Sequence, residues 1–138
     1  MADIAITAAN VKKGVGAVTK EVTFGATVTA GMVLYEKASD SEWYPVDADD
    51  AITAYNPLGI ALCGGADGQR GVVQIAGEIT AGGTLVAGSA YYCSATTAGS
   101  FAADLPVAGD YSTLVGIAKT TAIMLLALTA QGTVTAAL

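Results

Sequence analysis

The sequence predicts an all-β fold, a small β-barrel or sandwich of the β-tulip-like kind, on two observations. The first is composition: 53 % of the 138 residues are hydrophobic and only 13 % are charged, with 17 glycines and abundant alanine, valine and threonine. This mixture favours tightly turned β structure over a helical bundle. The second is spacing: apolar stretches of about six residues alternate with turn signals about every ten residues, as in small barrels and sandwiches.

The chain also contains an internal repeat. Residues 25–61 align without a gap on residues 82–118, so that Leu58–Ala61 falls on Val115–Ala118 and Tyr35 falls on Tyr92. We therefore predict two related β units, 25–77 and 82–132, inside one domain of residues 25–138. A chain of this length is long enough to bury a core without disulfides.

Each unit is expected to follow the same order of elements. An Ala-Gly turn precedes a first strand, a short second strand holds an aromatic residue, and a third strand contains a glycine that marks a bulge or a close backbone approach. In the first unit one helical turn, capped by Asp47, ends before Pro57. A loop with an Asp-Gly hairpin signal precedes the last strand of the first unit. The expected strands are Met32–Lys37, Leu58–Cys63 and Gly71–Ala76 in the first unit, and Ser89–Ala95, Val115–Lys119 and Ile123–Leu128 in the second; the aromatics are Tyr44 and Phe101, and the glycines Gly59 and Gly116.

Residues 1–24 lie outside the repeat and are expected to form an extended N-terminal arm. The stretches Ile4–Thr7 and Val18–Phe24 can pair as strands, while two intervening glycines weaken an independent fold. The segment has a net charge of +1, and the rest of the chain has −7. We expect it to bind a partner with acidic surface; the alternative is an edge strand of the body. The candidate binding residues are Ile4, Ile6, Lys12, Lys13 and Lys20.

The residues that usually carry out catalysis are scarce, and we expect neither an enzyme nor a bound cofactor or metal. The chain contains no histidine, the commonest general base and metal ligand. Cys63 and Cys93 lack metal-ligand spacing and are expected to be reduced thiols. The acidic stretch 36–50 lacks the glycine and glutamate of a calcium loop and is expected to be a solvated loop.

Charge and hydropathy bound the possible partners. An acidic chain, with a net charge of −6, argues against nucleic acid. No apolar run reaches the length of about 20 residues that a spanning helix needs, and no secretory leader is recognisable. With few charges and a mean hydropathy of +0.55, we expect apolar surface that drives self-association, most simply as a trimer. The aromatics expected in the core or in an oligomer interface, with a ligand platform as the alternative, are Tyr35, Trp43, Tyr44, Tyr91 and Tyr92.

Short motifs along nearly the whole chain resemble a family of small tailed-phage proteins. They are the opening MADIAITAANV, the turn Thr29–Gly31 before a strand ending in Tyr35, the Gly-Ile-Ala segments, the Gly-rich hairpin and the second copy AGSAYYCSATTAG. This family is encoded beside the major capsid gene and is similar in layout to the family of the phage lambda head-decoration protein. The motifs consist of common residues.

The resemblance implies a capsid decoration, or cement, protein without catalytic residues. Its partners would be the major capsid protein and further copies of itself. It would be made in the host cytoplasm and end on the exterior of the virion. The competing hypothesis is a tail-fibre or adhesin knob that presents Trp43 and Tyr44 to a host glycan.

Overall fold

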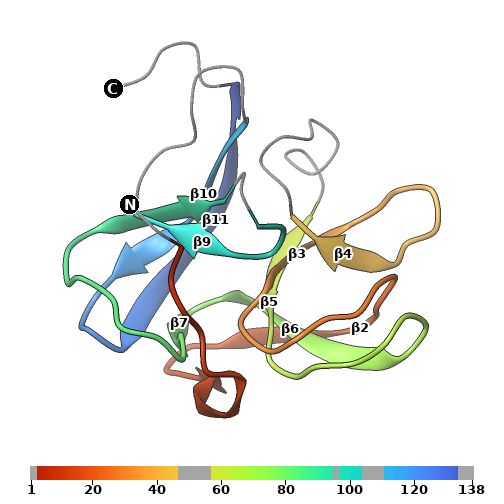
Figure 1. The fold of residues 1–138 in the computed structure, drawn as a ribbon, viewed down its shortest axis with the longest axis horizontal. Coiled ribbons are helices and arrows are strands. Elements are labelled where there is room, and N and C mark those ends of the chain that lie inside the picture. The colour runs from red at the N-terminus through yellow and green to blue at the C-terminus, as the bar shows by residue number, and fades with distance from the viewer. Residues whose placement is uncertain (1–2, 47–56, 95–96, 104–110, 134–138) are drawn as a thin grey trace.

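The computed structural model describes residues 3–46, 57–94, 97–103 and 111–133, and it is all-β, as the sequence predicts (Figure 1). One short 3₁₀ turn, η1, precedes eleven strands. The strands are β1 (Lys12–Lys13), β2 (Val18–Thr23), β3 (Val33–Glu36), β4 (Trp43–Pro45), β5 (Leu58–Ala61), β6 (Arg70–Ala76), β7 (Glu78–Thr80), β8 (Ala90–Cys93), β9 (Phe101–Ala102), β10 (Tyr111–Ala118) and β11 (Ile123–Thr133); η1 is Ala8–Asn10.

The strands form two antiparallel sheets. Sheet A has six strands in the order β1-β7-β11-β10-β8-β9, and sheet B has five in the order β2-β6-β5-β3-β4. The sheets do not close into a barrel, so of the two predicted architectures the structure is consistent with the sandwich. In Figure 1 the strands of sheet B lie to the right of those of sheet A.

The two sheets repeat one topology. The order β2-β6-β5-β3-β4 in sheet B corresponds strand by strand to β7-β11-β10-β8-β9 in sheet A. Registers correspond too: Leu34 pairs with Gly59 between β3 and β5, and Tyr91 pairs with Gly116 between β8 and β10. Two related β units are therefore present. They begin earlier than the predicted 25–77 and 82–132, because β2 and β7 occupy equivalent places.

The two equivalent glycines lie where a neighbouring strand comes close. A Cβ on Gly59 would lie 2.9 Å from a methyl carbon of Val73, and one on Gly116 would lie 2.4 Å from the backbone oxygen of Leu125. A register shift also falls between Leu114 and Gly116 in β10. The predicted close backbone approach and the bulge are thus confirmed at Gly116, whereas at Gly59 the close neighbour is the Val73 side chain.

Two hydrophobic cores hold the units together. The larger core lies between the sheets and joins Val33, Tyr35 and Ile60 of sheet B to the inner face of sheet A, including Tyr91 and Met124. The smaller core lies on the other side of sheet B. It contains Val22, Phe24, Val28, Leu34, Trp43, Ala61 and Val73.

The prediction that residues 1–24 form an extended N-terminal arm is wrong, because this segment is part of the body. Strand β2 pairs with β6 along all six of its residues, and β1 pairs with β7. Val11, Val22 and Phe24 are buried. The stretch Ile4–Thr7 forms no strand and does not pair with β2; its backbone instead bonds to Phe101 and Gly82. The segment is bound into both sheets because its apolar residues complete both cores.

The remaining predicted elements agree with the structure to within a few residues. The exceptions in length are the last two strands: β10 begins at Tyr111 instead of Val115, and β11 runs to Thr133 instead of Leu128. The Asp-Gly signal does connect the antiparallel strands β5 and β6, and Gly68 there has φ +87°, a conformation that favours glycine. The helical turn predicted after Asp47 lies outside the described residues.

Candidate functional site

Two of the predicted arm lysines line a groove between the sheets. The groove has a volume of about 580 Å³. Lys12 and Lys13 belong to β1 at the edge of sheet A, and Thr19 lies on β2 at the edge of sheet B. The remaining lining residues are mostly apolar: Val11, Leu62, Cys63 and Val72. The lining residues include two cations and no carboxylate, which fits an acidic or carbonyl-rich segment of a partner.

Lys20 does not belong to this groove. Adjacent residues of a strand face opposite ways, so Thr19 lines the groove while the ammonium of Lys20 lies 5.6 Å from the centre of the Trp43 ring. This is the geometry of a cation–π contact. The three lysines that the sequence groups together therefore divide between two surfaces.

Ile4 and Ile6 are engaged with the body. Both are partly buried and pack against the larger core. A Cβ on Gly31, whose φ is +94°, would lie 2.6 Å from the Cγ2 atom of Ile6, so the glycine leaves room for that side chain. Their predicted role as free apolar anchors would require them to leave these contacts.

The predicted aromatic residues are mostly core residues. Trp43 and Tyr91 are 1 % and 0 % exposed, and Tyr35 is buried. The Tyr91 hydroxyl accepts a hydrogen bond of 2.8 Å from the Val86 backbone N–H, which satisfies its buried polar end. Tyr92 is half-buried. A ligand platform that includes Trp43 is excluded by its burial.

Tyr44 lies at the β3–β4 hairpin and is held in a polar cluster. Its hydroxyl donates a 2.6 Å hydrogen bond to the Asp40 carboxylate, and the Lys37 ammonium lies 5.2 Å from the ring centre. The hydrogen bond from Tyr44 lowers the pKa of Asp40, and the same bond raises the pKa of Tyr44 to about 12. The hydroxyl of Tyr44 is thus engaged by Asp40, and its ring is in contact with Lys37 and packs closely on Gly25.

The two cysteines are free thiols in different environments. Cys63 is exposed in the groove, and Cys93 is buried in the larger core. Burial raises the pKa of the Cys93 thiol to about 12, because the thiolate would lose its hydration. Within the described ranges, no three histidine, cysteine, aspartate or glutamate residues gather as a metal site would require.

The described part of the chain contains no helix that is long and apolar enough to span a membrane. Neither the protein-family models nor the curated proteins include a match to this sequence. What the described residues offer is surface for binding: the basic groove and an exposed apolar face of sheet A. The sequence did not indicate the groove, since Thr19, Leu62 and Val72 meet there only through strand pairing.

Proposed function

We propose that the protein is a structural virion protein that binds the outer surface of a phage capsid and stabilises contacts between major capsid protein subunits. The observation that carries the proposal is the groove with Lys12 and Lys13 on an otherwise acidic chain. The two lysines would steer docking onto acidic capsid surface, and Val11 and Leu62 would contact apolar groups. The resemblance to decoration proteins supports the same reading.

A rigid β-sandwich suits this task. Each contact with the shell need only be modest, because a self-associating protein binds through several copies at once and avidity multiplies their affinities by about 10²–10⁴. We propose that the protein acts as a homo-oligomer, most simply a trimer, on the capsid exterior. The alternative of a glycan-binding knob is less well supported, because Trp43, one of its two platform residues, is buried.

The test compares two double variants that lose equal charge. Lys12→Ala with Lys13→Ala removes the groove cations, and Lys20→Ala with Lys37→Ala removes two cations outside it. Binding to undecorated shells of the encoding phage is measured between low and physiological salt. We expect the groove variant to bind about tenfold more slowly and with less salt dependence, and the control to bind like the unmodified protein. Equal binding by both variants would overturn the role of the groove.

A further inference from the structure

The repeated topology places two rows of residues at equivalent positions. Across sheet B the row is Thr19, Gln74, Ile60 and Val33, each residue paired with the next on the neighbouring strand. Across sheet A the equivalent row is Glu78, Leu125, Ile117 and Ala90. Each row runs through the same four strands of its unit. The two rows can therefore be compared position by position.

The environments of the two rows differ sharply. In sheet B the residues Gln74, Ile60 and Val33 are at most 2 % exposed. Ile60 and Val33 lie in the larger core, where the inner face of sheet A covers them. In sheet A the equivalent Leu125 and Ile117 are 51 % and 45 % exposed.

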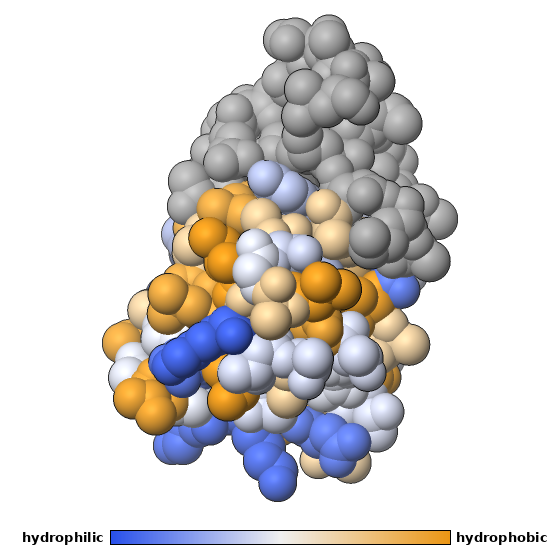
Figure 2. Space-filling model, turned by 90° about the vertical axis from the view of Figure 1, so that its left-hand side faces the viewer, coloured by the Kyte–Doolittle hydropathy of each residue, from blue (hydrophilic) through white to orange (hydrophobic). Residues whose placement is uncertain are grey.

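Figure 2 views the molecule from the side on which β9, β10 and β11 lie in Figure 1, and apolar residues are visible there among pale residues and a strongly hydrophilic group. The first unit thus buries a face that the second unit leaves open.

The open face of sheet A carries one ion pair among mostly uncharged residues. Strands β8, β10 and β11 contain no charged residue. Glu78, the β7 residue of the row, is charged, and its carboxylate forms a 2.8 Å ion pair with the Lys119 ammonium.

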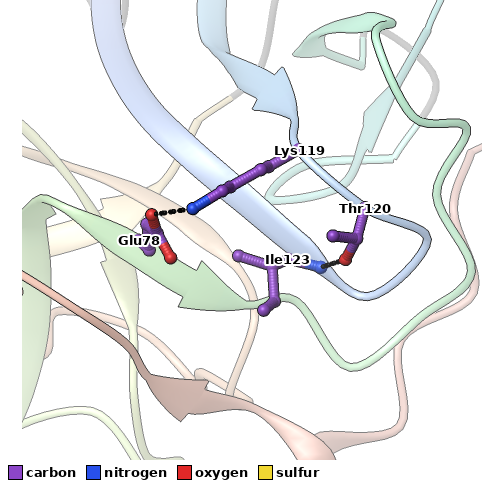
Figure 3. Close-up of polar contacts among 4 residues, drawn as sticks. All are labelled: Glu78, Lys119, Thr120 and Ile123. Carbon is purple, nitrogen blue, oxygen red and sulfur yellow. Dashed lines mark hydrogen bonds and ion pairs between the residues drawn. The ribbon is translucent and has the colours of Figure 1, made fainter.

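Figure 3 shows the Lys119 side chain reaching from the end of β10 across β11 to Glu78, near Ile123. Thr120 fixes the turn there by accepting a hydrogen bond of 3.0 Å from the Ile123 backbone N–H. The two charges of this ion pair cancel, so the face has no net charge, and its apolar residues lie beside the ion pair.

We propose that the outer face of sheet A, centred on Ile117 and Leu125, is covered by a second copy of this chain. In the first unit, the equivalent row packs against a β-sheet of the same chain. A β-sheet of a second copy is therefore the kind of surface that the exposed row of sheet A can pack against. The neutral face also lets two acidic copies approach without like charges at its centre. The alternative is that a shell protein covers this face, and the test must distinguish this from a second copy of the chain.

The size of the face sets the strength of the contact. Four strands spaced about 4.8 Å apart, over about five residues each, cover roughly 300 Å². A stable interface buries about 800 Å² per partner. We therefore expect the chain to associate weakly in solution, in a concentration-dependent way. The contact should last longer where a surface such as a capsid holds several copies next to one another. Because the net charge is −6, added salt should strengthen this association, whereas it should weaken binding through the lysine groove.

The test uses the full chain and a charge-matched control. Ile117→Lys with Leu125→Lys places two cations on the face. Ala38→Lys with Ser39→Lys adds the same charge at two exposed residues of the β3–β4 hairpin in sheet B. Sedimentation velocity is measured over about a hundredfold range of concentration. We expect the unmodified chain and the control to associate at the top of the range, and the face variant to remain monomeric with an unchanged circular dichroism spectrum.

A second measurement keeps the test decisive if the face variant misfolds. A benzophenone probe is attached at Leu125→Cys in a Cys63→Ser background and irradiated, with Ser39→Cys in the β3–β4 hairpin of sheet B as the control position. We expect covalent dimers from position 125 and few from position 39. Equal dimer yields would overturn the inference, as would a face variant that associates like the unmodified chain.

This inference deepens the self-association within the proposed function and does not depend on capsid binding. Suppose that the unmodified chain stays monomeric and that the face variant no longer decorates shells. This result would show that the shell covers the face, and it would overturn the inference that a second copy does. Self-association that is lost in the face variant, without any binding to shells, would leave this inference standing and overturn the capsid function.

Discussion

Substituting alanine at the two equivalent glycines should cost different amounts of stability. At Gly116 the nearest obstacle is the backbone oxygen of Leu125, which would lie 2.4 Å from the new Cβ. Real Cβ atoms essentially never approach closer than 3.0 Å, so β10 and β11 would have to separate by at least 0.6 Å in the middle of sheet A. At Gly59 the nearest obstacles are side-chain atoms of Val73, a methyl carbon at 2.9 Å and the Cβ at 3.0 Å, so that a shift of a few tenths of an ångström suffices.

The expected magnitudes follow from this difference. Overpacking a core costs about 1–3 kcal/mol. Gly116→Ala should fall at the upper end, about 3 kcal/mol, since a paired backbone cannot yield without losing hydrogen bonds. Gly59→Ala should cost about 1–2 kcal/mol. Gly88→Ala serves as the control: its φ is +86° and nothing lies within 4 Å of the new Cβ, so only the left-handed backbone contributes, about 1 kcal/mol.

Urea unfolding followed by the fluorescence of the buried Trp43 measures all three variants. With an m-value of about 1.5 kcal/mol/M, the midpoint should fall by about 2 M for Gly116→Ala and by about 0.7–1.3 M for Gly59→Ala. If the midpoint of Gly116→Ala falls no further than that of Gly88→Ala, the argument from close backbone approach fails.

Three further predictions test the environments of particular residues. At pH 8 a thiol reagent should modify Cys63 within seconds to minutes but Cys93 only on unfolding; fast reaction of both thiols would contradict the burial of Cys93. The pKa of Cys93 is raised on folding, so its contribution to stability is complete below about pH 9 and is lost as pH rises toward 12; the unmodified chain should lose stability more steeply between pH 8 and pH 11 than Cys93→Ala does. Deleting residues 1–24 removes β2 with Val22 and Phe24, so circular dichroism should show an unfolded chain. A folded product would instead support the prediction that residues 1–24 form an independent arm.

Local signals in the sequence predict much of this fold. The strands around Tyr35, Leu58 and Tyr91 follow from apolar runs bounded by glycine turns, and these features need no knowledge of distant contacts. The repeat predicts the equivalent places of Gly59 and Gly116 because a duplicated sequence repeats its pairing.

The position of residues 1–24 does not follow from local signals. Whether Val18–Thr23 pairs with Ile4–Thr7 or with β6 depends on contacts about fifty residues away, for which the segment's own pattern gives no information. The same holds for the separation of Lys20 from Lys12, which only the register of β2 reveals.

The two apolar rows show most clearly what cannot be predicted from the sequence alone. Ile60 and Ile117 occupy the same Gly-Ile-Ala context, yet they are 2 % and 45 % exposed. Their neighbours in sequence are alike, and the difference lies in what packs against each sheet. Sequence alone could predict that the chain has apolar surface to cover, but not which of two equivalent faces remains open.

The copy number of this chain on purified particles of the encoding phage tests the proposed function most directly. Quantitative mass spectrometry of intact virions, calibrated against the major capsid protein, measures it. A decoration protein that contacts subunits across the whole shell should be present at hundreds of copies, in a fixed ratio to the major capsid protein. A few copies per particle would indicate a tail or fibre component, and absence from washed particles would contradict a structural role in the virion.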